Sequence, residues 1–587
     1  MKFLTVEDSW KLFCAYAFPE SEGNRAPDNL EEIARNILKK CGELPLAIKI
    51  TAASLAKTTL PDDWQSKLTK LEEVGTSDDH VMDIMDILKL SYHSLPAHLK
   101  ACFAYLSFFP EDEAIECEYL IYLWMGEGFI PAGKNPWDCL DQLGNLCLVE
   151  VWEEEWRLKK YCKVHDLLLD LAILISTENK CAFNVEDAFS KLHSVHTGGD
   201  RWGRLFLAKK DIDEAVVSER RLVSPELVRT LSLSRNAEIG GNIPAMLFSG
   251  MRVLRVLDLS YTNISILPAC VGEMKLLKVL NLRETKIKRL PECVRCLKNL
   301  SFLDVSRCSE LDRKAPKWIS ELQCLQHLEG PFEQMPKGLL KLESLRILRI
   351  SGEWWLSLSR EEDGLVRLED LGKMSAIEEI RFKVEHDSQL KSMEDGILAP
   401  LLSMRRLDVR NKIAQTDLPQ FPERMNEMRN LKHLRLEYFA VPSWICCFAN
   451  LMFLYLQNCD CSNYPELQEM PNLVSLWLDV NRRCKEVPKA FGKSGGFPHL
   501  RFFSIHDFPE LEEFPEIEDG AMPWLEKLEL WRCRKLNKVG EGLERLKRLK
   551  EFNFELSEKD ELREMLKEGG IYWEKIKTAN PEIIIKK

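Results

Sequence analysis

The sequence lacks the features that would place the chain in a membrane or outside the cell. Its first ten residues contain Glu7 and Asp8 and no apolar run after a basic start, so they are unlike a secretory signal peptide. No stretch comes close to the roughly 18 consecutive apolar residues that a membrane-spanning helix needs. The 19 cysteines are scattered and odd in number, which predicts reduced thiols. These absences predict a cytoplasmic protein with no integral membrane segment.

A surplus of positive charge is missing too. The 587 residues include 81 Lys and Arg against 93 Asp and Glu, which gives a net charge of −12. Nucleic-acid-binding proteins generally carry a basic surface that neutralises phosphates. The charge balance therefore predicts that nucleic acid is not a partner. A chain of this length also exceeds one ordinary core, so several domains or a repeat array are expected.

Motifs for catalysis and metal binding are missing as well. Gly492-Lys493-Ser494 is the only Gly-Lys-Ser, and Val487 stands where a phosphate-binding loop needs its first glycine. Cys293 and Cys296 form a CxxC pair, but no second pair follows at zinc-site spacing. No local signature of a Ser-His-Asp or Cys-His site is present. The sequence predicts no catalytic residue, no metal site, and a protein that binds rather than an enzyme.

What the sequence does contain is an internal repeat. Residues 254–276 read LRVLDLSYTNISILPACVGEMKL, and residues 277–299 read LKVLNLRETKIKRLPECVRCLKN. Both have the form LxxLxL, then a polar or Cys position and an LPxxV-like return, which is typical of leucine-rich repeats. In such a repeat LxL is a short strand whose leucines stack on those of the neighbouring coils. The sequence predicts an α/β solenoid over 226–587.

Further copies of the strand triplet follow along the chain, with an irregular stretch at 351–403. The predicted inward positions are Val228/Leu231/Leu233, Leu325/Leu328/Gly330, Leu345/Leu348/Ile350, Ile377/Ile380/Phe382, Met404/Leu407/Val409, Leu431/Leu434/Leu436, Leu451/Leu454/Leu456, Leu473/Leu476/Leu478, Leu500/Phe503/Ile505, Leu525/Leu528/Leu530 and Leu549/Phe552/Phe554. Three residues after the last inward position stand Cys308, Cys459 and Cys533, where the regular copies have Thr262 and Thr285. These cysteines are predicted to fill the small capping position of the repeat.

The residues between the inward positions point to the open face of the predicted sheet. Five aromatic residues of the C-terminal half stand there: Phe453, Tyr455, Trp477, Phe502 and Trp531. If they are exposed, they form a partner-binding stripe, because aromatic side chains are enriched at the energetic centres of interfaces. If the solenoid curls or a loop covers them, they belong to the core. Both interpretations are open at the level of the sequence.

Residues 1–225 do not show the repeat and are predicted to be mainly helical. Apolar residues at helical spacing indicate helices within 29–60 and 82–130, and residues 146–164 alternate as a β-hairpin. Helix, helix, hairpin, helix is the order of a winged-helix domain. We expect a helical part at 1–75, a winged-helix domain at 76–178 and a linker at 179–225.

Four stretches resemble the plant nucleotide-binding leucine-rich-repeat disease resistance proteins of the coiled-coil (non-TIR) class. SWKLF at 9–13, with AF at 17–18, is similar to the family's SWxLFxxxAF block, and CGELPLA at 41–47 resembles CGGLPLA with Glu43 in place of a glycine. Residues 99–130 match the long block before the wing, and VHD at 164–166 stands where the family has MHD. The resemblance implies a helical and winged-helix remnant of an NB-ARC module followed by the solenoid.

The resemblance also implies a nucleotide switch in a complete family member, in which ADP holds a silent form and ATP an active one. Pro45 would pack on the adenine, and His165 would reach the diphosphate, since a proline ring offers a flat apolar surface and an imidazole can donate to phosphate oxygens. Alternatively, His165 only opens the helix that begins at Asp166. The implied partners are a pathogen effector or a guarded host protein, recognised through the repeats, and possibly a full-length receptor.

Other functions compete with this one. An ATP hydrolase is disfavoured by the missing phosphate-binding loop, and a ubiquitin-ligase adaptor would need an F-box-like segment where residues 1–225 match the receptor blocks instead. A truncated regulator or decoy scaffold without nucleotide switching is the remaining alternative.

The first prediction concerns nucleotide binding. The family's Walker loop and coiled coil are expected ahead of residue 1, so Pro45 and His165 supply half a nucleotide site at most. Because phosphate contacts provide much of the affinity for ADP or ATP, the purified chain should bind neither nucleotide tightly. Isothermal titration calorimetry measures this directly, and micromolar affinity for ADP would refute it.

Overall fold

The computed structural model divides into two compact units. Unit 1 comprises Met1–Glu154, Lys159–Ser234 and Met246–Asp258, and unit 2 comprises Glu155–Leu158, Arg235–Ala245 and Leu259–Lys587. The residues that the structure describes are 4–56, 58, 60–74, 84–131, 133–154, 159–178, 204–206, 228–237, 240–242, 248–350, 355–358, 364–395, 401, 403–412, 418–459, 466–479, 487–555, 565–566, 568–580 and 584–586. The domain boundaries predicted near 75, 178 and 225 all adjoin residues outside these ranges and stay predictions.

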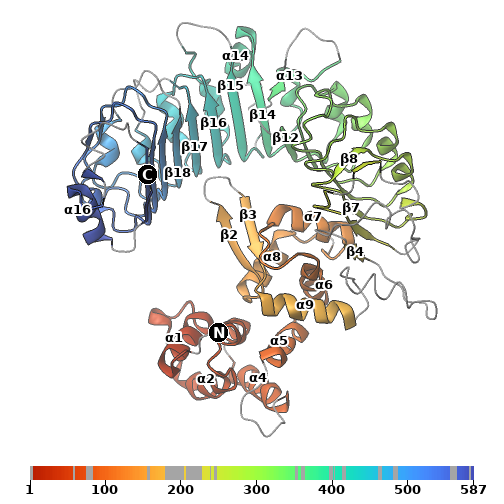
Figure 1. Cartoon of the computed structure of the whole chain (residues 1–587), viewed down its shortest axis with the longest axis vertical. Coiled ribbons are helices and arrows are strands. Elements are labelled where there is room, and N and C mark those ends of the chain that lie inside the picture. Colours follow the sequence, from red (N-terminus) through yellow and green to blue (C-terminus); the bar gives the residue numbers. More distant parts are fainter. Residues whose placement is uncertain are drawn as a thin grey trace. The chain divides into compact units, whose positions relative to one another are not determined.

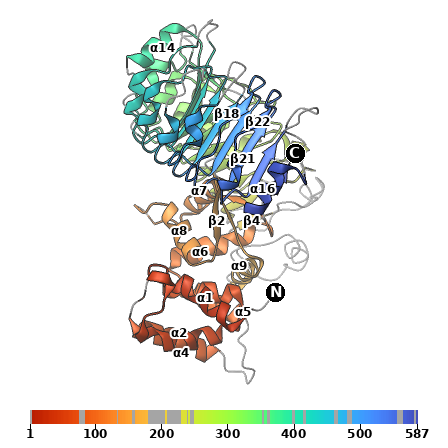
Figure 2. The same cartoon turned by 90° about the vertical axis from the view of Figure 1, so that its left-hand side faces the viewer.

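The N-terminal part of unit 1 is a cluster of short helices around one apolar core (Figure 2). The helices are α1 (Val6–Ala17), η1 (Glu22–Asn24), α2 (Asp28–Lys40), α3 (Pro45–Leu55), α4 (Pro61–Val74) and α5 (Ile84–His93). The Thr5 side chain caps α1 by accepting a hydrogen bond from the Asp8 amide at 3.1 Å. Trp64 is fully buried at the centre, where its ring packs against Phe13 and Phe18. The α2 side chains that reach this core recur at helical spacing, as the sequence predicts.

The predicted winged-helix order of helices and hairpin is confirmed. Its elements are α6 (Ala97–Tyr105), η2 (Leu106–Phe108), β1 (Ile115–Glu116), α7 (Cys117–Glu127), α8 (Trp137–Asn145), β2 (Glu150–Glu154), β3 (Lys159–Lys163) and α9 (Asp166–Glu178). Strands β2 and β3 form the antiparallel hairpin, and β1 adds to β3 on its other side. Helix α7 ends because Gly128 takes a left-handed conformation with φ of 83°.

The first repeat strands also belong to unit 1. Strands β4 (Arg204–Phe206), β5 (Thr230–Ser232) and β7 (Val256–Asp258) pair in parallel in that order. Strand β4 lies inside the range that the sequence predicts as a linker, and it pairs with β5 in the same register as a repeat strand would. Residues 179–203 and 207–227 of the predicted linker lie outside the described residues.

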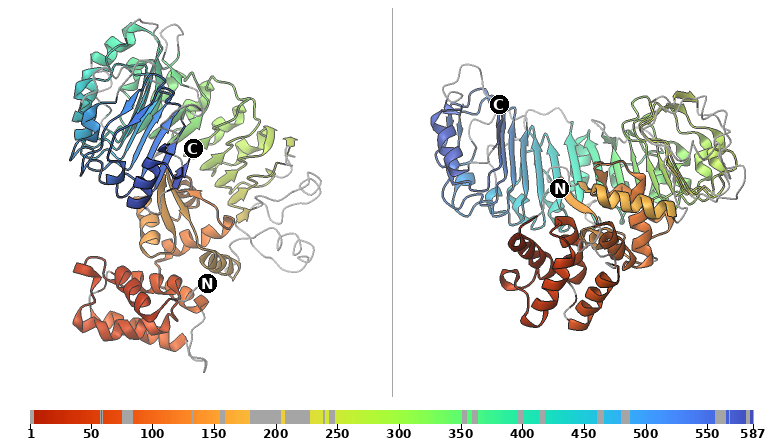
Figure 3. Two further views of the ribbon diagram at one scale, coloured as in Figure 1. Left: turned by 60° about the vertical axis from the view of Figure 1, so that its left-hand side comes forward. Right: turned by 60° about the horizontal axis from the view of Figure 1, so that its bottom comes forward.

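Unit 2 is built on a parallel sheet with one strand from each coil, as the repeat pattern predicts (Figures 1 and 3). The strands of this sheet in unit 2 are β9 (Val279–Asn281), β10 (Phe302–Asp304), β11 (His327–Gly330), β12 (Ile347–Ile350), β13 (Leu356–Ser357), β14 (Glu379–Val384), β15 (Arg406–Asn411), β16 (His433–Glu437), β17 (Phe453–Gln457), β18 (Ser475–Asp479), β19 (Phe502–His506), β21 (Lys527–Trp531), β23 (Glu551–Phe554) and β24 (Ile584–Lys586). Two further pairs, β6 (Gly240–Asn242) with β8 (Asn263–Ile266) and β20 (Glu513–Phe514) with β22 (Lys538–Val539), form separate two-stranded parallel sheets. Inward leucines stand opposite one another: Leu407, Leu434, Leu454 and Leu476 are partners in successive strands and are all buried.

Short helices return the chain on the other side of each coil. They are η4 (Ala269–Glu273), η5 (Glu292–Cys296), η6 (Lys317–Glu321), η7 (Lys337–Lys341), α13 (Leu368–Leu371), α14 (Asp387–Glu394), η8 (Glu423–Glu427), η9 (Ser443–Cys447), η10 (Leu467–Glu469), η11 (Lys489–Gly492), η12 (Leu543–Arg545) and α16 (Ile571–Ala579). A proline directly precedes most of the 3₁₀ turns, since its fixed φ suits the entry to a helix. In the irregular stretch 351–403, α13 and α14 take the place of a 3₁₀ turn.

The capping position that the sequence assigns to small residues is buried in each copy. The preceding residue adopts a left-handed conformation, as at Glu284 and Arg307, each with φ of 56°. This turn carries Thr285 and Cys308 back under the strand. The Thr285 hydroxyl donates to the Leu282 carbonyl at 2.8 Å, and the Cys308 thiol donates to the same oxygen at 3.1 Å. Burial raises the pKa of the equivalent Cys459 to about 12, so these cysteines are structural thiols.

The second prediction concerns Gly492, the glycine of the single Gly-Lys-Ser. A Cβ added there would lie 1.8 Å from the carbonyl oxygen of Glu516 in the next coil, so Gly492→Ala must displace backbone. We expect the variant to lose about 2 kcal/mol or more of stability. The control is Ser494→Ala, because the structure uses the Ser494 amide to bind Glu518 at 3.0 Å. Differential scanning calorimetry should show a lower midpoint for Gly492→Ala alone, and equal midpoints would contradict the packing argument.

Candidate functional site

The two residues predicted to contact nucleotide both start helices in unit 1. Pro45 is the first residue of α3 and is half-buried. The preceding Gly42 and Glu43 have φ of 62° and 59°, so Glu43 holds a left-handed conformation that the family's glycine adopts without strain. His165 is exposed, and its Nδ1 accepts from the Leu167 amide at 3.3 Å at the start of α9. This is the helix-opening role, and the acceptor at Nδ1 leaves the ring proton on Nε2. The nucleotide roles of both residues stay predictions.

Unit 1 contains contacts between the winged-helix domain and the first repeat strands that the sequence does not reveal. The Tyr119 hydroxyl of α7 donates to Asp258 Oδ2 of β7 at 2.7 Å. At the end of α7, the buried Glu127 carboxylate accepts from the Thr230 hydroxyl of β5, and its backbone carbonyl accepts from Arg255 Nη1 at 2.8 Å. Charged and hydroxyl groups therefore join these two parts of unit 1.

The five predicted aromatic residues lie on the same face of the sheet of unit 2, but they differ in exposure. Tyr455 is opposite Trp477, and Trp531 is opposite His506 in a neighbouring row of the sheet. Tyr455, Trp477 and Trp531 are partly exposed. Phe453 and Phe502 are buried, with 4% and 1% of their surface exposed. Of the two interpretations that the sequence leaves open, the core interpretation therefore holds for these two phenylalanines, because their rings are covered by neighbours on the same face.

The distances between ring centroids show which side chains cover the two phenylalanines. The Trp477 ring lies 4.6 Å from that of Phe502 and 6.0 Å from that of Tyr455. The His433 ring packs 6.2 Å from Phe453. Phe453, Tyr455, Trp477 and Phe502 are here called the aromatic group. Tyr455 and Trp477 form its partly exposed outer layer, and Phe453 and Phe502 belong to the core.

Beside these aromatics, the same face carries charged residues that the sequence analysis does not single out. Asp408 on β15 is 1% exposed and lies 3.0 Å from Arg381 Nε, 3.3 Å from Arg406 Nη2 and 3.2 Å from His433 Nδ1. Although burial alone would raise it, Arg406 and Arg381 hold the pKa of Asp408 well below its usual range. Asp408 is therefore an ionised carboxylate that is stabilised by the two arginine side chains.

A second buried carboxylate, Glu437 on β16, is shared in the same way. Arg410 Nε lies 2.7 Å from Glu437 Oε2, and Arg435 Nη2 lies 2.6 Å from Oε1. The Arg435 guanidinium also lies over the Tyr455 ring at 4.3 Å, which connects the charged and aromatic groups. Charged residues alternate with mostly apolar residues in the segments IRFKV, LDVRN and LRLE. This pattern is the sequence signal that could have predicted the charged group.

Asp479 on β18 connects side chains of the strands on both sides of it, β17 and β19. Its Oδ2 accepts from the Tyr455 hydroxyl, and its Oδ1 lies 2.9 Å from His506 Nδ1. Burial, together with the hydrogen bond to Asp479, raises the pKa of Tyr455, so the phenol stays protonated. The face therefore offers polar groups held in fixed orientations beside exposed aromatic surface.

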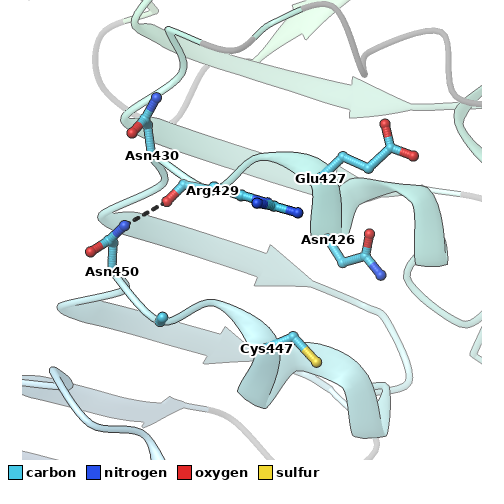
Figure 4. Close-up of a pocket in the computed structure, with 7 residues that line it drawn as sticks. Asn426, Glu427, Arg429, Asn430, Cys447 and Asn450 are labelled. Carbon is cyan, nitrogen blue, oxygen red and sulfur yellow. Dashed lines mark hydrogen bonds between the residues drawn. The ribbon is translucent and has the colours of Figure 1, made fainter.

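A hollow of about 1090 Å³ lies away from this face, next to the turns that contain η8 and η9 (Figure 4). Its lining residues include Asn426, Asn430 and Asn450. Asn450 Nδ2 donates to the Arg429 carbonyl at 2.8 Å, and Asn472 repeats this contact one coil later with the Ala449 carbonyl at 2.8 Å. These side chains tie successive turns together, which is a structural role.

The part of the chain that the structure describes shows neither a metal site nor a membrane-spanning helix. There, no group of three or more His, Cys, Asp or Glu side chains is arranged to hold a metal ion. Cys293 instead packs against Gly272 of the preceding coil, where an added Cβ would lie 2.7 Å from the Cys293 Cβ. None of the helices within the same ranges combines the length and apolarity needed to cross a bilayer.

The parallel strands, buried capping positions and 3₁₀ returns together define a leucine-rich-repeat protein. A family model described as "Leucine-rich repeat region" matches residues 212–582, which is more than half of the chain, so the chain belongs to this family. A second model, described as "Disease resistance protein Winged helix domain", matches residues 108–172. The resemblance to disease resistance proteins is thereby confirmed for the winged-helix domain and the repeats.

Curated relatives agree with this assignment. "Probable disease resistance protein RF45" of Arabidopsis thaliana is 25% identical over 98% of this chain and 66% of the relative. "Disease resistance protein RPP8" of the same plant is 27% identical over 97% of this chain and 63% of the relative. The chain thus spans less than two thirds of the length of these proteins.

Solved structures with similar chains are also leucine-rich-repeat proteins. A leucine-rich-repeat protein of Leptospira interrogans is 17% identical, with a TM-score of 0.41 over 69% of this chain and 99% of its own. The repeat ectodomain of the Arabidopsis receptor kinase HAESA is 18% identical, with a TM-score of 0.40 over 64% of this chain and 69% of its own.

The third prediction concerns His433, whose pKa is lowered to about 4 by burial and by Arg406. Unfolded histidine takes up a proton near pH 6.5, so the stability contributed by neutral His433 is complete above pH 6.5 and falls as the pH drops toward 4. Between pH 7 and pH 5 the loss should reach about 2 kcal/mol.

His433→Gln keeps an N–H group near Asp408 but does not titrate, so its stability should change less over this interval. The exposed His499→Gln serves as control and should behave like the unmodified chain. Thermal midpoints at pH 7 and pH 5 measure the effect. Equal pH dependence in all three proteins would show that His433 is not the titrating group.

Proposed function

We propose that the chain is the sensing part of a plant defence receptor and recognises a protein partner through the open face of its repeat sheet. The partner is a pathogen effector or a host protein that effectors attack. The winged-helix domain and the disease resistance relatives support the defence role. The observation that supports recognition at this face is the partly exposed aromatic surface of Trp477, Tyr455 and Trp531.

Regulation by ADP and ATP belongs to the same proposal. The blocks around Pro45 and His165 support it, and the ring proton on His165 Nε2 is a suitable donor for a phosphate oxygen. In a longer receptor, the phosphate-binding loop would supply the remaining contacts. The contacts of Tyr119 and Glu127 with the first repeat strands give the winged-helix domain a direct path to the repeats within unit 1.

The fourth prediction tests this function in the plant. Disrupting the gene should increase growth of the pathogen that the receptor detects, and the unmodified gene should restore resistance. A gene carrying Trp477→Ala and Trp531→Ala should fail to restore it, because truncating aromatic side chains at the centre of an interface commonly costs more than about 2 kcal/mol of binding energy.

The matched control is Trp524→Ala, since Trp524 is 38% exposed but lies in the turn before β21. It packs against Arg548 at 3.6 Å. This variant should restore resistance fully. Thermal midpoints of the purified proteins establish that the double variant is folded. Full resistance conferred by a folded double variant would exclude Trp477 and Trp531 as the recognition site.

A further inference from the structure

A group of four arginines lies on the open face of unit 2. Arg381, Arg406, Arg410 and Arg435, here called the arginine cluster, lie on the neighbouring strands β14, β15 and β16. Their side chains are between 18% and 27% exposed. The carboxylates beneath them, Asp408 and Glu437, are only 1% exposed. The anions therefore form the floor, and the cations form the surface that a partner would meet.

The cluster carries more positive than negative charge. Arg381 and Arg406 share Asp408, while Arg410 and Arg435 share Glu437. Glu379 on β14 is the register partner of Arg406 and also interacts with it, so three carboxylates face the four guanidinium groups. His433, the other nitrogen base at Asp408, adds no charge at neutral pH. The surplus is local, because on β12 Arg349 lies within 4 Å of two carboxylates, Glu329 and Glu379. An anionic group is therefore favoured over β14–β16 and not over β11 and β12.

The guanidinium groups are also held in place. The buried Trp355 ring lies 5.1 Å from Arg381, 5.4 Å from Arg410 and 5.7 Å from Arg435. Contact with an aromatic face orients a guanidinium and limits the conformational entropy that binding would cost. Three arginines fixed around one ring present several N–H groups toward the same space, which suits bidentate recognition of carboxylates.

The aromatic group continues the same row of the sheet. Arg381, Asp408, Arg435, Tyr455 and Trp477 are register partners on β14 to β18. With neighbouring strands about 4.8 Å apart, this row extends for about 19 Å. That length suits a peptide segment of several residues rather than a single small ion.

We propose that the arginine cluster and the adjoining Tyr455 and Trp477 form a binding site for an acidic peptide segment of a partner protein. Carboxylates of the segment bind the arginine cluster, and an apolar or aromatic side chain that follows them packs on Tyr455 and Trp477. The inference rests on the proposed function, because it specifies the chemistry of the partner that the repeats recognise.

The test uses the full purified chain and a fluorescein-labelled peptide in which three glutamates precede a tryptophan and a leucine. Fluorescence anisotropy measures its affinity. Replacing the three glutamates by glutamines should weaken binding at least about tenfold. Replacing the tryptophan and leucine by serines should also weaken it. Equal affinity of the glutamate and glutamine peptides would overturn the proposal.

A second test uses a substitution in the chain itself, which adds a carboxylate beside the arginine cluster and is expected to leave the fold intact. Gln457 Oε1 accepts from Arg435 Nη2 at 2.9 Å, so Gln457→Glu places an additional anion at the cluster with almost no change of shape. The affinity for the glutamate peptide should fall at least about fivefold. Gln323→Glu, at an exposed position outside the sheet, changes the net charge equally and should have no effect. Unchanged affinity of a folded Gln457→Glu variant would overturn the proposal.

Two further measurements complete the test. Arg410→Gln combined with Arg435→Gln should abolish peptide binding, whereas Arg295→Gln combined with Arg307→Gln, at exposed arginines of earlier coils, should not. Should the first pair fail to fold, Gln457→Glu still decides the question. Inorganic tripolyphosphate should displace the peptide poorly, because it cannot use the aromatic group. Displacement as effective as that by unlabelled peptide would show a general anion site and overturn the peptide assignment.

The outcomes separate this inference from the proposed function. If the peptide binds as expected but disruption of the gene leaves pathogen growth unchanged, the site stands and the defence role is wrong. If the gene restores resistance but the glutamate peptide shows no preference, the defence role stands and the chemistry assigned to the partner is wrong.

Discussion

The stacking of inward-facing apolar side chains between neighbouring strands is the interaction on which the rest of unit 2 depends. One coil cannot bury its own apolar face, so each strand is stabilised by the strands on both sides. Leu407, Leu434, Leu454 and Leu476 occupy equivalent positions and are fully buried. This stacking fixes the register, and the register brings Arg381, far away in the sequence, into one row with Trp477. The surface chemistry of the face is therefore a consequence of the core.

Much of the fold could be predicted because every coil of the solenoid must meet the same structural requirements. A coil must place an inward triplet, a small buried cap and a return turn at a constant spacing, so each feature occurs several times in the sequence. The caps at Thr285 and Cys308 could be matched for this reason, and both are buried. Strand β4 has a copy 26 residues later in β5, but Trp202 stands where the other copies have their first aliphatic residue, so the repeat pattern does not match there. The same applies to 351–403, where α13 and α14 break the spacing.

The candidate site could be predicted only in part. Alternation along a strand assigns Phe453 and Trp477 to the open face, but exposure depends on which side chains of other coils cover them. Phe502 is buried because Trp477, from a different repeat, lies over it. The arginine cluster combines charges from three coils, and a search for short motifs does not detect such a group. For Pro45 and His165, the sequence suggests a ligand through resemblance, while the local backbone explains both residues as helix starts.

The sharing of Asp408 and Glu437 between pairs of arginines has a consequence for how this surface can change during evolution. Loss of both arginines at one carboxylate leaves a buried anion without a cation, whereas loss of one leaves the anion satisfied. A first substitution at either carboxylate is therefore tolerated, whereas a second substitution at the same carboxylate is not. Drift at this face should be strongly epistatic, and Asp408 and Glu437 should covary with their arginines among related sequences. The surface chemistry of this face can therefore change by single substitutions, and the two buried carboxylates limit which further substitutions the fold tolerates.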